Sequence, residues 1–291
     1  MTRLVSMPPA AQFAPLLTAY SRAAAAKRRQ LVLGLALVAI ALAVSAVGAE
    51  VRPVTLWNKI GNFTSYFDRL LKLDSGMRVW TEPQEWFWGL ARWSRLLGET
   101  ALIAYIATLT GAFAAFICAA PAGRNLMRHA PVRFTVRRVL EFCRSVPDIV
   151  FAMIFVAAFG LGALPGVLAM AIHTSGALGK LFTEVVENID MRPVEGIAAT
   201  GGSWLAQLRF AVTMSNLVSY TLLRFEVNVR GATVIGFVGA GGIGQDLIVA
   251  IRKFYYSDVS AMLLMIIVTV MMIDTLSARL RHRLLAMEHP P

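Results

Sequence analysis

The sequence predicts an all-α protein, a polytopic transmembrane helix bundle of about six spans. Of the 291 residues 57% are hydrophobic and only 15% are charged, with a mean hydropathy of +0.63. A soluble domain usually carries about 25% charged residues. Apolar runs of membrane-crossing length recur along the chain, and no βαβ pattern accompanies them. Composition therefore places the chain in a membrane before any motif is considered.

The predicted spans cover residues 31–49, 97–120, 147–163, 164–182, 208–238 and 258–278. A helix needs about 20 apolar residues to cross a bilayer. The third and fourth segments are short or interrupted by Gly and Pro, so five spans remain possible. The first segment is longer than the hydrophobic region of a cleaved signal peptide, and we interpret it as an uncleaved span.

A long polar segment, residues 50–95, joins the first two spans. It ends in E-W-F-W-G-L-A-R-W, residues 85–93, which is dense in tryptophan. Trp favours the membrane–water interface. We expect a helix lying along the membrane surface at this stretch.

Basic residues orient the bundle. They cluster before the first span, after the second and after the last: Arg22, Lys27, Arg28 and Arg29; Arg124, Arg128, Arg133, Arg137 and Arg138; Arg279, Arg281 and Arg283. With six spans the three clusters share one side, which the positive-inside rule makes cytoplasmic. The net charge of +11 therefore indicates topology rather than nucleic-acid binding.

A glycine-rich loop follows the fifth span. Gly239, Gly241 and Gly244 have the G-x-G-x-x-G spacing of a dinucleotide-binding loop, and Gly242 lies between them. That function requires a preceding strand, whereas the preceding residues continue a membrane-length apolar segment. We interpret the four glycines as a site of close helix packing and as a bent gate where a transport path closes.

No catalytic site is predicted. The stretch S-G-A-L-G-K-L is not a phosphate-binding loop, because Thr174 replaces its first glycine and Leu181 its hydroxyl residue. A Ser/His/Asp set, a pair of carboxylates and a His/Cys cluster are all missing from the sequence. Cys118 and Cys143 do not suggest a disulfide framework. We expect no enzyme activity, no cofactor and no metal; any ATP would be bound by another chain.

The fifth span contains charges in the run R-F-E-V-N-V-R. Ionisable groups at membrane depth usually face a bundle interior or a wet cavity. On a helix Glu226 and Arg230 share a face and can pair, as can Arg224 and Asn228. Either these pairs only fix helix packing, or Arg224 meets an anion in a translocation path. His173, in the fourth span, is either a packing residue or a neighbour of that path.

The connection after the fourth span, residues 184–207, predicts a helix–turn–helix. Pro193 suits the first turn of a helix, and Gly201 with Gly202 ends it before a second short helix at residues 203–210. A side chain at Gly201 would clash or force a costly backbone angle. Such a segment on the cytoplasmic side suggests docking to a partner; a simple amphipathic connector is the alternative.

At these residues the sequence resembles permeases of binding-protein-dependent ABC importers. Their cytoplasmic coupling loop reads E-A-A, then G after three further residues, then I-x-L-P. Here Glu195-Gly196-Ile197 stands for E-A-A and the glycine is in place, whereas Ala211, Thr213 and Met214 replace I, L and P. The resemblance implies that contact with an ATPase is made by this loop: Glu195, Gly196, Ala199, Gly201 and Gly202.

From about residue 96 onward the chain resembles the phosphonate-import permeases of that family. The runs R-F-E-V-N-V-R and G-A-G-G-I-G carry the likeness, with V-E-G-I-A-A-T-G and I-H-T-S-G-A-L-G-K-L. It implies a type I importer permease in the bacterial inner membrane. It also implies a second permease copy, separate ATPase subunits and a periplasmic binding protein that delivers phosphonate or a related phosphorus oxyanion. Residues 1–29 would be a cytoplasmic tail, 30–95 the first span with a periplasmic segment, and 96–291 the permease domain.

A stand-alone secondary transporter or channel for a small anion is the rival interpretation. It would need an ion-coupling site of its own, and no pair of interrupted half-helix repeats supports one.

Overall fold

The computed structural model describes residues 14–50, 52–127, 129–189, 191–201 and 214–288. These residues form helices, and their only β feature is one isolated bridge between Lys72 and Arg78. The helices are α1 (Ala14–Gly48), α2 (Pro53–Leu70), α3 (Pro83–Trp86), α4 (Leu90–Ala122), α5 (Ala130–Ser145), α6 (Asp148–Phe159), α7 (Ala163–Glu187), α8 (Met191–Ala199), α10 (Met214–Ile235), the 3-10 helix η2 (Gly236–Val238), α11 (Ile243–Arg252) and α12 (Tyr256–Glu288). The all-α prediction is confirmed. The chain divides into two compact units, residues 1–66 and 67–291.

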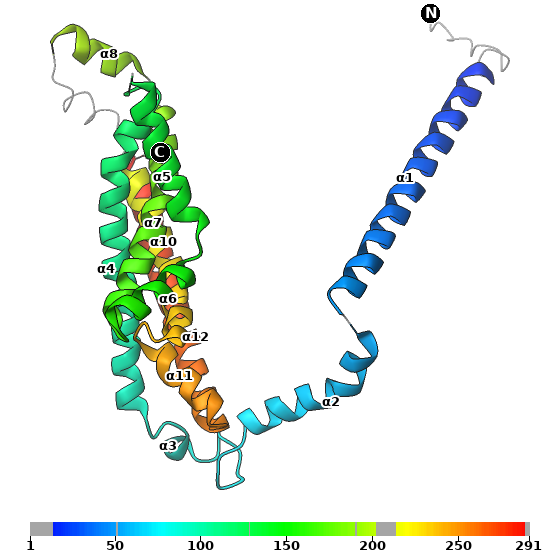
Figure 1. Cartoon of the computed structure of the whole chain (residues 1–291), viewed down its shortest axis with the longest axis vertical. Helices are drawn as coiled ribbons and strands as arrows, with labels where there is room; N and C mark the ends of the chain where they lie inside the picture. The colour runs from blue at the N-terminus through cyan, green and yellow to red at the C-terminus, as the bar shows by residue number, and fades with distance from the viewer. Residues whose placement is uncertain (1–13, 51, 128, 190, 202–213, 289–291) are drawn as a thin grey trace, which may run out of the picture. The chain divides into compact units, whose positions relative to one another are not determined.

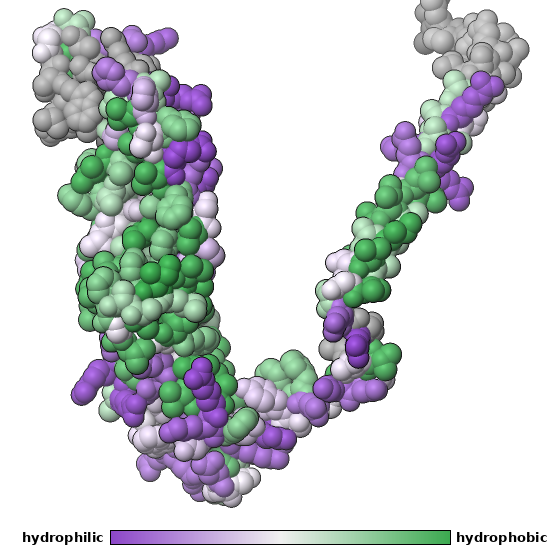
Figure 2. Space-filling view, in the orientation of Figure 1, coloured by the Kyte–Doolittle hydropathy of each residue, from purple (hydrophilic) through white to green (hydrophobic). Residues whose placement is uncertain are grey.

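The first unit contains α1 and most of α2. Residues 18–48 of α1 are apolar enough to cross a membrane. The helix begins well before the expected span at 31–49, so the basic stretch from Arg22 to Arg29 is helical and continuous with it. Figure 2 shows the apolar surface of α1 and the hydrophilic group nearer its N-terminal end.

In the second unit α4, α7 and α10 run alongside one another, and α8 lies beyond the end of α7 (Figure 1). One apolar core joins α4, α6, α7 and α10; its best buried members include Ala104, Ala152, Ala169, Met170 and Ile235. A second core joins the start of α4 to α11 and α12. On the face drawn in Figure 2 this unit is apolar over its middle and hydrophilic toward both ends, as expected of a bilayer-spanning body.

The predicted six spans are only partly recovered. Among the described residues three helices are long and apolar enough to cross a membrane alone: residues 18–48, α4, and residues 256–283. Two bent pairs, α5 with α6 at 86° and α10 with α11 at 48°, raise the number to five. Helix α7, expected as the fourth span, has 25 residues. It is not counted because polar residues such as His173 and Lys180 lower its hydropathy.

The tryptophan-rich stretch does not form the expected surface helix. Helix α3 ends at Trp86 and α4 starts at Leu90, with a turn between them. Trp86 donates through Nε1 to Ser260 Oγ at 2.9 Å, and Trp88 Nε1 donates to Asp258 Oδ1 at 2.8 Å. The indoles therefore fasten the start of α4 to the first turn of α12, and their N–H groups satisfy tertiary partners rather than the membrane interface.

The loop after α2 belongs to the second unit and is partly buried in it. Leu73 and Val79 are buried, at 4% and 1% exposure. Asp68, in the last turns of α2, forms ion pairs with Lys72 and with Arg78, the latter at 2.8 Å. Hydrogen bonds from these two cations lower the pKa of the Asp68 carboxyl. The last turn of α2, which belongs to the second unit, is thus joined to the loop that follows it.

Candidate functional site

A buried hydroxyl–amide cluster joins three helices in the middle of the second unit. Asn228 of α10, only 2% exposed, donates through Nδ2 to Thr108 Oγ1 of α4 at 2.8 Å and to Thr174 Oγ1 of α7 at 2.9 Å. Both amide hydrogens are therefore used. Hydrogen bonds of this kind hold membrane helices together where apolar packing gives no preference over lipid.

Arg224 lies one turn before Asn228 on the same face of α10. Its Nε donates to Thr174 Oγ1 at 3.3 Å. Asp148, the first residue of α6, attracts the guanidinium electrostatically. Among the described residues no carboxylate lies within 4.0 Å of Arg224, in contrast to the other cation of this run, Arg230. Arg224 thus keeps a half-buried positive charge supported by a hydroxyl and a more distant carboxylate.

His173 precedes Thr174 but does not join the cluster. Its Nδ1 donates to the backbone carbonyl of Val146 at 3.1 Å. Val146 is the residue at which α5 ends and the 86° bend to α6 begins. The helices are close here: a Cβ added to Gly176 would lie 2.5 Å from the backbone nitrogen of Arg144. His173 therefore supports this bend between α5 and α6.

The opposite face of α10 contradicts one expectation. Glu226 and Arg230 do not pair with each other. Glu226 Oε1 instead lies 3.6 Å from the guanidinium of Arg281, and Arg230 pairs with Asp274. Both partners belong to the neighbouring helix α12, whose charges are complementary at two successive levels. Intrahelical spacing alone could not reveal this, because the competing partners are 44 residues or more away in sequence.

The glycine loop breaks the span between η2 and α11; the helix of residues 216–238 and α11 are bent by 48° relative to each other. Gly239, Gly241 and Gly242 have φ angles of +87°, +85° and +73°, which glycine adopts at little cost. Gly239 accepts a backbone hydrogen bond from Gly162 at 3.0 Å, at the start of α7. A helix precedes the loop, so it lacks the strand that a dinucleotide site needs.

Helix α11 then starts in close contact with its surroundings. The Ile243 N–H donates to Thr100 Oγ1 of α4 at 2.9 Å. A Cβ on Gly242 would lie 2.4 Å from the same hydroxyl oxygen, and a Cβ on Gly244 would lie 1.9 Å from the Thr233 carbonyl. A side chain at Gly242 would displace the Thr100 hydroxyl, and one at Gly244 would displace backbone, so both positions require glycine for space.

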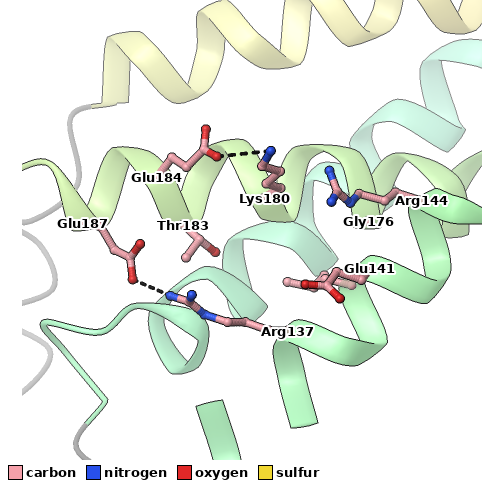
Figure 3. A pocket seen from close by; sticks show the side chains of 9 residues that line it. Arg137, Glu141, Arg144, Gly176, Lys180, Thr183, Glu184 and Glu187 are labelled. Carbon is pink, nitrogen blue, oxygen red and sulfur yellow. Dashed lines mark hydrogen bonds and ion pairs between the residues drawn. The ribbon is translucent and has the colours of Figure 1, made fainter. Parts of the chain in front are cut away.

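A groove of about 150 Å³ lies between α5 and α7, toward the end that leads to α8 (Figure 3). Its wall is charged: Arg137, Glu141, Arg144, Lys180, Glu184 and Glu187. Glu187, the last residue of α7, pairs with Arg137 of α5 and accepts a hydrogen bond from the Arg124 N–H at 2.8 Å. Because Arg124 lies two residues after the end of α4, this carboxylate joins α4, α5 and α7 near the start of α8.

Helix α8 carries the residues expected to contact an ATPase. Glu195, Gly196 and Ala199 are exposed. The helix begins at Met191, two residues before Pro193, and ends at Ala199. Gly201 has a φ of +77°, but a Cβ there would meet nothing within 4 Å. Of the two alternatives expected at Gly201, the structure supports the costly backbone angle, whereas no clash is found among the described residues. Gly202 and the second helix at 203–210 lie outside the described residues.

Several site residues were not predicted from the sequence, among them Thr108, Thr174, Asp148 and Glu187. Thr108 looks like any threonine in an apolar helix, where its hydroxyl bonds to its own backbone, here to the Ala104 carbonyl at 2.6 Å. Asp148 follows Pro147 at the start of an apolar helix, an acidic residue at a helix N-terminus. The role of Glu187 could not be predicted from the sequence, because its partners Arg137 and Arg124 lie far from it along the chain.

Comparison with known proteins gives consistent results. Residues 107–285 match the family model described as binding-protein-dependent transport system inner membrane component. A phosphite transport system permease protein, PtxC of Stutzerimonas stutzeri, is 40% identical over 67% of this chain and 72% of its own length. The phosphate-import permease protein PhnE of Mycolicibacterium smegmatis is 38% identical over 67% of this chain, which spans only 37% of that longer protein.

A solved structure of the MetNI methionine ABC transporter in inward-facing conformations matches with a TM-score of 0.58. It is 17% identical and covers 70% of this chain and 98% of that chain. A likeness at that identity shows the fold alone. The family model covers more than half of the 291 residues. The chain therefore belongs to the family of binding-protein-dependent transport system inner membrane components, the permeases of ABC importers.

Proposed function

We propose that this chain is the permease subunit of an ATP-driven importer for phosphonate, phosphite or a related phosphorus oxyanion. Arg224 carries the proposal: it is a half-buried cation at membrane depth with hydroxyl and amide neighbours and no carboxylate within 4.0 Å among the described residues. The names of the relatives, which refer to phosphite and phosphate, support the same substrate class.

The chemistry of the cluster suits a passing oxyanion. A phosphonate carries one or two negative charges, so an apolar path would present a large desolvation barrier. A guanidinium can bind two phosphonate oxygens at once. Transport also requires that the anion leaves again, so the site must be weak. Attraction between Arg224 and Asp148 moderates the charge. His173 holds the α5–α6 bend beside the path, and Glu226 and Arg230 brace α10 against α12.

Coupling to ATP hydrolysis would pass through α8. Its residues Glu195, Gly196 and Ala199 are exposed and suited to a partner surface. The C-terminal end of α7, which leads to α8, is anchored by Glu187 to α5 and to the residues that follow α4. A displacement of α8 would therefore be transmitted to the bend at Val146 and to the three helices of the polar cluster, α4, α7 and α10. The glycine loop Gly239–Gly244 would then serve as the gate at the opposite part of the path.

We further infer the assembly that the family implies: two permease copies, identical or paired with a second permease, two ATPase subunits and a periplasmic binding protein, in a bacterial inner membrane. Residues 1–29 would be cytoplasmic, 50–95 periplasmic and 184–207 the coupling loop. ATP would be hydrolysed by the partner subunits.

The test is copurification of the chain with its ATPase and binding protein, followed by phosphonate-stimulated ATP hydrolysis and uptake in proteoliposomes. Gly201→Val forces a β-branched residue to a φ of +77°, at a cost of roughly 1–3 kcal/mol. It should lower ATPase recovery and uptake while the protein still inserts. Gly98→Ala in α4 is the control, because it lies outside the predicted coupling loop and its Cβ meets nothing within 4 Å in a helix that alanine favours.

Uptake that persists without any ATPase subunit would favour a secondary carrier and overturn the importer assignment. Normal ATPase recovery in Gly201→Val would instead reject α8 as the docking element, but it would not affect the proposed substrate class.

A further inference from the structure

Helix α2 has one apolar and one polar face. Trp57, Ile60, Phe63 and Phe67 recur at intervals of three or four residues and so share a side of the 18-residue helix. Their exposed fractions are 77%, 55%, 64% and 49%. The opposite side carries Asn58, Asn62, Ser65 and Arg69. Four large apolar side chains in a row, each about half-exposed or more, form a face that is unusual for a helix surrounded by water.

The N-terminal end of α2 follows directly on a membrane-crossing helix. The apolar segment of α1 ends at Gly48, and α2 begins at Pro53. Residues 49–52 can span at most about 14 Å, even when fully extended. The polar headgroup layer on one side of a bilayer is roughly 5–8 Å deep. The start of α2 must therefore stay close to the membrane boundary that α1 has just crossed.

The C-terminal end of α2 is held at the starts of two other crossing helices. Leu70 belongs to the core that contains Trp93 of α4 and Val259 of α12. Arg69 Nη1 donates to the hydroxyl of Tyr256, the first residue of α12. In the predicted topology α1 ends, and α4 and α12 begin, on the same side of the membrane. Both ends of α2 are then tied to one boundary, and a helix about 27 Å long between them lies along it.

We propose that α2 is an interfacial helix, with Trp57, Ile60, Phe63 and Phe67 inserted at the headgroup–acyl boundary of the outer leaflet. Helices that lie in this layer combine an apolar aromatic face with a polar face. Trp is enriched there, and the long basic side chains of Lys59 and Arg69 can reach the headgroups. The proposal concerns the lipid surface and does not depend on the transported substrate.

The apolar face of α2 could be covered either by lipid or by another protein. A second copy of the chain or a binding protein could also cover such a face. Lipid is the occupant we propose, because the short connection to the membrane-crossing helix α1 keeps α2 close to the bilayer. The interface helix expected at residues 85–93 is thus assigned to residues 53–70, because the indoles of the later stretch are used in tertiary contacts.

The experiment places one spin label at a time on full-length protein in phosphatidylcholine–phosphatidylglycerol nanodiscs, in a Cys118→Ala/Cys143→Ala background. Ile60→Cys and Phe63→Cys report on the apolar face, and Asn58→Cys and Asn62→Cys are matched controls on the polar face of the same two turns. We expect the first pair to be at least threefold more accessible to oxygen than to a water-soluble nickel chelate, and the second pair to show the reverse.

Three results would overturn the proposal. Equal access of nickel to both faces would place α2 in water. Protection of Ile60 and Phe63 from both reagents would show that protein covers the face. A pattern that fails to alternate with helical period over residues 58–65 would mean that α2 is not a helix in the bilayer. The yield and melting temperature of each cysteine variant before labelling serve as the control that the protein is folded.

Discussion

The two faces of α10 treat charge in different ways. Toward α12, Glu226 and Arg230 each meet an opposite charge from that helix. Toward α4 and α7, Asn228 and Arg224 meet the hydroxyls of Thr108 and Thr174. Residues that alternate in the run R-F-E-V-N-V-R are therefore sorted by helical geometry into an ion-paired face and a hydroxyl-lined face.

The difference shows how a membrane helix can separate assembly from transport. A paired charge in a low-dielectric setting is fixed, because losing its partner leaves an expensive isolated ion. A cation that is supported by neutral hydroxyls keeps much of its attraction for an external anion. The α12 side of α10 accordingly suits holding the bundle together, and the α4–α7 side suits meeting substrate.

The largest effect is expected at Glu226. Its side chain is 12% exposed, and Arg281 opposite is 21% exposed. Glu226→Ala strands this arginine and should cost about 3 kcal/mol, seen as lower yield and a lower Tm in detergent. Glu226→Gln combined with Arg281→Gln should restore most of the loss, because no charge is left unpaired. A double variant as unstable as Glu226→Ala would show that packing, not pairing, sets the cost.

A change at Arg224 should separate uptake from assembly. Arg224→Gln keeps a hydrogen-bond donor for Thr174 but removes the charge, so the transported anion loses its counter-charge. We expect uptake to fall about tenfold, which corresponds to about 1.4 kcal/mol, while yield and basal ATP hydrolysis stay near those of the unmodified protein. Arg230→Gln is the control: it should lower stability more than uptake per folded complex. Normal transport by Arg224→Gln would remove this residue from the path.

A smaller effect is expected at the threonines. Thr174 Oγ1 accepts hydrogen bonds from both Asn228 and Arg224, whereas Thr108 accepts only the one from Asn228. The isosteric change Thr174→Val should therefore cost about 1 kcal/mol, and Thr108→Val less. Tm of the two variants, measured side by side, tests the order. The reverse order would mean that Asn228 depends on α4 rather than on α7.

Much of the fold follows from sequence patterns that are local. Apolar runs of sufficient length predict α1, α4 and α12, and the charges of α10 predict a polar interior. What could not be predicted depends on long-range partners. Glu226 was expected to pair four residues away because only intrahelical spacing is visible in a sequence, and the charges of α12 compete successfully. The Trp86 and Trp88 indoles were expected at the membrane surface, but Ser260 and Asp258 offer their N–H groups acceptors.

The backbone bond between Gly162 and Gly239 has a mechanical consequence. It joins two chain breaks, the one before α7 and the one after η2, through main-chain atoms alone. Two such breaks would ordinarily swing independently, each with its own helix. Because this bond joins them, we expect the two breaks to turn together, so that a tilt of α10 would be transmitted to α7 through the main chain.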